Sequence, residues 1–108
     1  MGFQTIRITE SPGFVVQRLR ALQANEAFAL VQGGVASATD VDRACRVATG
    51  CQQGPLEWAD TVGLDNLLQE LERLEKAYGD RYRPNLLLSQ HVKAGRTGKR
   101  AGRGVYQY

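Results

Sequence analysis

The 108-residue chain lacks the hallmarks of several protein classes. No apolar run approaches the roughly 20 residues of a membrane-spanning helix, and the first residues have no apolar core behind a basic start, as a secretory signal would. The 12 glycines form no glycine-rich turn of the kind that binds a dinucleotide between a strand and a helix. We therefore expect one cytoplasmic domain, without a membrane partner, that does not hold NAD by itself.

Cysteine and histidine are also scarce. Cys45 and Cys51 are six positions apart, which fits neither a zinc knuckle nor a CxxC redox motif. Either both are reduced thiols, with Cys45 on a buried helix face, or they form a redox pair. His91 is the only histidine, and a single histidine does not make a metal site, so no metal is predicted.

Acidic residues are missing from the end of the chain. Seven of the 14 basic residues follow Asp80, and no Asp or Glu does. These basic residues alternate with glycine, whereas nucleic-acid-binding domains tend to align them along a helix or interleave them with stacking aromatics. Nucleic acid is therefore not a predicted partner.

What is present is helical periodicity. Apolar residues recur at steps of three and four between start and stop signals, such as Ser37 before the second helix and Gly54-Pro55 before the third. The pattern predicts five helices, near residues 12–33, 38–49, 54–62, 64–78 and 85–94. We therefore predict an all-α fold, a single helical domain over residues 11–108 that follows a short extended N-terminal arm at residues 1–10.

Several side chains are assigned by their surroundings. Glu26 falls on the apolar stripe of the first helix, where a carboxylate needs a partner, and the neighbouring Asn25 is predicted to cap a helix or to contact another helix. Trp58 and Tyr78 are predicted to fill the core between the short and long helices, with a role as interface anchors as the alternative. The aromatic end of the chain, Gly102 to Tyr108, is predicted to dock back on the helices because its rings are too apolar to remain in water.

Five motifs, in order, resemble the C-terminal helical domain of the 3-hydroxyacyl-CoA dehydrogenases. They are Ser11-Pro12-Gly13-Phe14-Val15-Val16-x-Arg18-Leu19, Asn25-Glu26-Ala27, Gly34-Val35-Ala36-Ser37-x-x-Asp40-Val41-Asp42-x-Ala44, Gly54-Pro55-Leu56-Glu57-x-x-Asp60-x-Val62-Gly63-Leu64-Asp65 and Gly98-Lys99-Arg100-x-Gly102-x-Gly104-Val105-Tyr106-x-Tyr108. The resemblance covers nearly all of the chain from Ser11 and implies a helical domain like the C-terminal part of 6-phosphogluconate dehydrogenase.

The resemblance implies a role in an oxidoreductase. In that family a Rossmann domain binds NAD and carries the catalytic residues, while the helical domain forms the dimer contact and closes over the acyl-CoA. The chain is then the dimerisation and substrate-closing domain of an enzyme that oxidises 3-hydroxyacyl-CoA to 3-oxoacyl-CoA in fatty-acid or aromatic-acid degradation, and it is inactive without its Rossmann domain. The alternative is a free-standing helical module that binds a protein or an acyl-CoA.

The resemblance also suggests site residues. Gln17 stands where single-copy relatives carry an asparagine that places the substrate, so no catalytic residue is assigned. Arg18, Lys99 and Arg100 are candidates for binding the substrate, the last two through the CoA phosphates. For the basic end, a solvated tail or contact with an acidic partner are the alternatives.

A partner helical domain is also implied. Gln17 suits the second of two tandem copies, as found in 3-hydroxyadipyl-CoA-type dehydrogenases, where one copy takes the place of the partner subunit. The stripe around Val16, Leu19, Phe28 and Val31 is wider than one core contact needs, so these residues are the predicted interface. We expect a homodimer, or a pseudo-dimer with another copy on the same chain.

Overall fold

The computed structural model describes residues 12–108, and five α-helices lie in this part of the chain. They are α1 (Pro12–Gln32), α2 (Ala38–Thr49), α3 (Pro55–Val62), α4 (Leu64–Tyr78) and α5 (Leu86–Lys93). Two short 3₁₀ turns, η1 (Asp80–Tyr82) and η2 (Lys99–Ala101), follow α4 and α5. The predicted all-α class and the five helices are confirmed, whereas the predicted arm at residues 1–10 lies outside the described residues.

Local signals place the ends of the helices. The Ser37 hydroxyl accepts a hydrogen bond from Asp40 N at 3.2 Å and starts α2, and the Asn85 side chain does the same for α5 from Leu87 N at 2.9 Å. Gly50 ends α2 in the left-handed conformation, with φ of 70°, which a glycine adopts without strain. These caps explain why the predicted boundaries agree closely with the structure.

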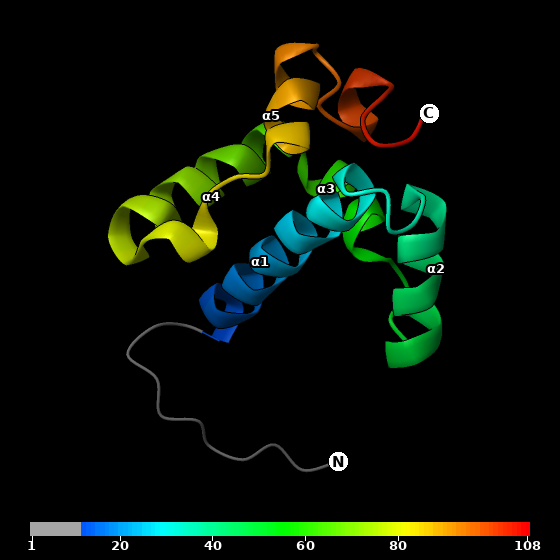
Figure 1. Cartoon of the computed structure of the whole chain (residues 1–108), viewed down its shortest axis with the longest axis horizontal. Helices are drawn as coiled ribbons and strands as arrows, with labels where there is room; N and C mark the ends of the chain where they lie inside the picture. The colour runs from blue at the N-terminus through cyan, green and yellow to red at the C-terminus, as the bar shows by residue number, and fades with distance from the viewer. Residues whose placement is uncertain (1–11) are drawn as a thin grey trace.

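Helix α1 lies at the centre of the molecule and contacts the other four helices (Figure 1). Figure 1 shows α2 on one side of it and α4 on the other, with α5 and the end of the chain above. The buried apolar residues come from all five helices and from η1: Ala21, Ala24, Ala27, Phe28, Val41, Leu56, Ala59, Leu64, Leu67, Leu71, Leu74, Tyr82 and Leu88. Within residues 12–108, no helix has both the length and the apolar character needed to cross a bilayer.

Asn25 joins α1 to the segment before α5. Its side-chain nitrogen donates to the Arg83 carbonyl at 2.8 Å, and its side-chain oxygen accepts from Asn85 N at 2.7 Å. The predicted contact of Asn25 with another part of the fold is confirmed. Glu26, in contrast, is exposed, so its predicted place on a buried stripe is wrong.

A buried carboxylate joins α2 to α3. Asp42 is only 1% exposed, and it accepts hydrogen bonds from Leu56 N at 2.8 Å and Glu57 N at 3.1 Å. These backbone groups begin α3 and have no partner within that helix, so Asp42 caps α3 from a neighbouring helix. A side chain at Gly54 would occupy the space of Asp42, which explains the glycine before Pro55.

A second buried carboxylate binds the end of the chain. Asp60, in α3, is also 1% exposed and accepts hydrogen bonds from Val105 N at 2.9 Å, Tyr106 N at 3.1 Å and the Tyr108 hydroxyl at 2.6 Å. The Tyr106 hydroxyl reaches Asp42 at 2.6 Å. The predicted docking of the aromatic end is therefore confirmed, and its anchors are two carboxylates rather than apolar contact alone.

The Asp42 cap leads to a stability prediction. Asp42→Ala should lower the free energy of unfolding by about 2–4 kcal/mol, because it leaves Leu56 N, Glu57 N and the Tyr106 hydroxyl without their acceptor. Asp40→Ala removes an exposed carboxylate from the same helix and should cost less than about 1 kcal/mol. Urea unfolding followed by circular dichroism measures both, and equal losses would contradict the assigned cap.

Candidate interaction site on the first helix

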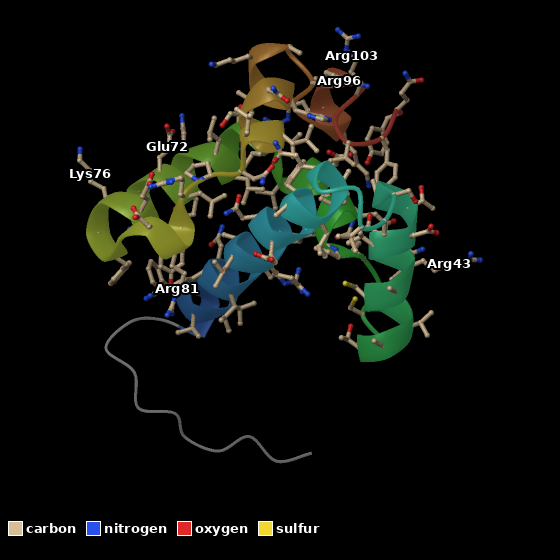
Figure 2. The ribbon with its side chains drawn as sticks, viewed as in Figure 1. Arg43, Glu72, Lys76, Arg81, Arg96 and Arg103 are labelled. Carbon is tan, nitrogen blue, oxygen red and sulfur yellow. The ribbon has the colours of Figure 1, made fainter. Side chains whose placement is uncertain are left out.

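An apolar groove of about 600 Å³ runs between α1, α2 and the start of α3. Its walls are the apolar side chains Leu19, Leu22, Leu30, Val41 and Pro55, together with Cys45. Gln23, Glu26 and Arg81 give it polar edges, and Figure 2 shows Arg81 beside the first turns of α1. Such a groove is suited to binding an apolar surface.

The groove lies beside a stripe of exposed apolar residues. Val16 is 51% exposed and Leu19 is 62% exposed, and Val15 and Leu30 are also exposed. The opposite face of α1, which carries Ala21, Ala24 and Phe28, lies in the core. Because apolar residues occupy both faces of α1, the helix can serve the core and still present an apolar surface to a partner.

The four residues of the predicted interface separate into these two faces. Val16 and Leu19 are exposed, and Val31 is partly buried against the core. Phe28 is 1% exposed, and its ring meets that of His91 edge-on, with centroids 6.1 Å apart. The structure therefore corrects the assignment of Phe28, which the helical period places on the buried side.

Arg18 is held by two tyrosines. Its guanidinium carbon lies 4.1 Å from the centroid of the Tyr78 ring, and its Nε donates to the Tyr82 hydroxyl at 2.8 Å. Tyr78 was predicted to fill the core, but it is 52% exposed and covers this arginine instead. Arg18 thus joins α1 to the end of α4, and the neighbouring Gln17 is exposed.

Lys99 and Arg100 lie at the other end of the molecule. Both are exposed in η2, where the Lys99 ammonium is 5.7 Å from the Tyr108 ring centroid. Arg100 lines a small hollow of about 180 Å³ with Asn66 and Thr97, near the start of α4. Figures 1 and 2 show this end, marked by Arg103, well apart from the first turns of α1. The three predicted substrate-binding residues are therefore not gathered into one site.

Asp42 and Asp60 are absent from the residues predicted to form a site. A signal was available, because Asp42 falls one position after Val41 on the inner side of α2 and Asp60 follows Leu56 by four residues on α3. Burial raises the pKa of the Asp42 carboxyl, and the hydrogen bond from Tyr106 opposes that rise. A carboxylate on an inward-facing stripe predicts polar partners, and here the partners come from the end of the chain.

The described residues provide no cluster of three or more His, Cys, Asp or Glu side chains that could hold a metal ion. They do provide an exposed apolar stripe, a groove beside it and a basic end of the chain. These are features of a surface that binds other molecules or domains.

Comparison with known proteins gives a consistent family. Residues 13–108 match the family model described as 3-hydroxyacyl-CoA dehydrogenase, C-terminal domain. The chain is 40% identical to a probable 3-hydroxybutyryl-CoA dehydrogenase of Bacillus subtilis, a match that covers all of this chain and 38% of that protein. It is also 40% identical to the 3-hydroxyadipyl-CoA dehydrogenase of Escherichia coli, over 84% of this chain and 19% of that protein.

A solved structure shows the same fold. The crystal structure of (S)-3-hydroxybutyryl-CoA dehydrogenase PaaH1 from Ralstonia eutropha matches 92% of this chain and 35% of that protein, with 41% identity and a TM-score of 0.85. The chain thus spans well under half the length of these relatives.

The docked tyrosines lead to a pH prediction. Burial raises the pKa of Tyr106 and Tyr108 above the ordinary value of 10.0, and the carboxylates Asp42 and Asp60 raise it further. The folded chain then keeps phenolic protons that the unfolded chain releases, so the free energy of unfolding should fall as the pH rises above about 10. The slope from Tyr106 is at most about 1.4 kcal/mol per pH unit, and half-exposed Tyr108 contributes less because water screens it.

Urea unfolding at several alkaline pH values measures this slope. The double variant Tyr106→Phe with Tyr108→Phe should show a smaller fall than the original chain. Tyr78→Phe, which alters the half-exposed tyrosine over Arg18, is the control and should leave the slope unchanged. A double variant with an unchanged slope would show that these phenols do not govern the alkaline loss of stability.

Proposed function

Because this chain belongs to the family of 3-hydroxyacyl-CoA dehydrogenase C-terminal domains, we propose that it is the dimerisation and substrate-closing domain of an NAD-dependent enzyme. The reaction is the oxidation of 3-hydroxyacyl-CoA to 3-oxoacyl-CoA. The observation that carries the proposal is the match of nearly the whole chain to one contiguous part of longer dehydrogenases.

NAD is assigned to another domain of the enzyme. A dinucleotide fold needs parallel strands with a glycine-rich turn, whereas the described residues form helices, turns and isolated bridges. A Rossmann domain is therefore the first partner of this chain. The enzyme works in the cytoplasm in this proposal.

The exposed face of α1 is the proposed contact with a second helical domain. Val16, Leu19 and partly buried Val31 supply apolar side chains, and the groove beside them can receive side chains of the partner. The partner is an identical chain, or a second copy of the domain in a longer protein. The 19% coverage of the 3-hydroxyadipyl-CoA dehydrogenase shows that the matched segment is a small part of that relative, which leaves room for a second copy.

The acyl-CoA contact is proposed for the start of α1 and for η2. Gln17 is exposed at the start of the helix, where Arg18, fixed by Tyr78 and Tyr82, holds the backbone in place. The exposed Lys99 and Arg100 supply positive charge for the CoA phosphates. In this arrangement Arg18 acts by positioning its neighbour.

A chimera tests the catalytic proposal. This chain replaces the matched 38% of the Bacillus subtilis relative, and oxidation of 3-hydroxybutyryl-CoA is followed by the absorbance of NADH. The chimera should be active, and Gln17→Asn should raise kcat by about tenfold or more, because the shorter amide corrects a misplacement of roughly 1 Å. Gln32→Asn, another exposed amide on α1, is the control and should leave kcat unchanged.

A folded chimera that oxidises nothing at saturating NAD, with either residue at position 17, would contradict the proposal. If the chain alone then bound an acyl-CoA in calorimetry, a free-standing binding module would be the better description. Circular dichroism establishes whether the chimera is folded.

The proposed interface has its own test. Sedimentation at tens of micromolar should show a dimer, since an interface worth about 8 kcal/mol has a Kd of about 1 μM. Leu19→Asp should give a folded monomer because Leu19 is 62% exposed and a charge there would be desolvated in the interface. Val47→Asp, on an 81% exposed residue of α2, should remain dimeric. A strict monomer in the original chain would instead favour pairing with a second copy on one polypeptide.

A further inference from the structure

Two cysteines lie close together where α2 ends. Gly50 turns the chain in the left-handed conformation, and the residue after such a glycine commonly packs back against the last turns of the helix. That residue is Cys51, and its Sγ lies 3.7 Å from the carbonyl oxygen of Cys45. The spacing of six therefore brings the two cysteines to one place, although it matches no familiar cysteine motif.

Local hydrogen bonds hold this arrangement. The Thr49 hydroxyl donates to the Cys45 carbonyl at 2.7 Å and accepts from Cys51 N at 3.4 Å. The backbone between the two cysteines is thus fixed, and a bridge between the sulfurs requires rotation of the side chains. Both sulfurs are free thiols in the structure.

Both thiols can be reached by a small oxidant. Each cysteine is partly exposed, Cys45 on the wall of the α1 groove and Cys51 in an adjacent hollow of about 170 Å³. Burial raises the pKa of the Cys45 thiol, and the nearby Cys51 adds to the rise. Cys51 lies in the loop beyond the end of α2, and we assign the first oxidation to it.

We propose that Cys45 and Cys51 are a site of reversible oxidation that forms a disulfide within the chain. A peroxide oxidises the Cys51 thiol to a sulfenic acid and is reduced to water. The Cys45 sulfur then attacks the Cys51 sulfur, the S–S bond forms, the S–O bond breaks, and the hydroxyl leaves as a second water with the Cys45 proton. The two thiols supply both electrons, and a dithiol reductant reverses the reaction.

The disulfide also changes the groove between α1, α2 and the start of α3. It changes the Cys45 side chain on the wall that it shares with Val41 and Leu19, and it ties the last turns of α2 to the loop that leads to Pro55. This inference rests on the local geometry of α2 and does not depend on the proposed function.

The test uses the whole chain with hydrogen peroxide at neutral pH. Intact mass should fall by the mass of two hydrogen atoms, both thiols should disappear from a thiol titration, and dithiothreitol should restore both. In Cys45→Ser, Cys51 should stop at a sulfenic acid that dimedone traps. In Cys51→Ser no intrachain bridge should form, so the intact mass should not fall by two hydrogen atoms.

The effect of folding on the bridge is measured as the equilibrium constant for thiol–disulfide exchange with glutathione. The equilibrium constant for forming the bridge should be about tenfold or more larger in the folded chain than in concentrated urea, because the α2 terminus holds the two residues together. A ratio below one would show that the fold keeps the sulfurs apart and would overturn the proposal. So would oxidation that adds oxygen atoms, or that joins separate chains, without the intrachain bridge.

Discussion

The fold depends on two buried carboxylates that satisfy backbone amides. Asp42 caps α3 from α2, and Asp60 receives the last turn of the chain from within α3. A buried charge is costly unless it is hydrogen-bonded, and here each carboxylate accepts three hydrogen bonds. The close approach of Gly54 to one carboxylate and Gly104 to the other leaves no room for a side chain at either position.

The helices could be predicted from the sequence because their signals are local. A serine at 37, a left-handed glycine at 50 and a proline at 55 act within one turn of their helices, so the boundaries agree to within about two residues. The roles of Asp42 and Asp60 could not be predicted with equal ease. Their partners Tyr106 and Tyr108 lie 46 or more residues beyond Asp60 and Asp42, and periodicity carries no information about such pairs.

The candidate site was predicted in part. The apolar stripe of α1 is wider than one core contact needs, which indicated a surface for a partner. Val16 and Leu19 are exposed on that surface. Phe28 was misplaced because α1 is apolar on both faces, although its spacing of four and seven residues from the buried Ala24 and Ala21 places it on the inner face. The contacts of Arg18 with Tyr78 and Tyr82 could not be predicted, because the turn after α4 brings Tyr82 to Arg18 only in the folded chain.

The attachment of residues 105–108 to Asp60 also determines when the fold can be completed during synthesis. Until those residues leave the ribosome, Asp42 and Asp60 lack the tyrosine hydroxyls and amides that they accept in the finished molecule. The Asn25 side chain likewise lacks its hydrogen-bond partners until residues 83–85, which follow it by about 60 residues, have been synthesised. Contacts between such distant positions carry the entropic cost of closing long loops and slow the search for the native state. The domain is therefore a unit whose last residues complete its folding, and a nascent chain halted before Tyr106 would expose the surface of α3 to chaperones.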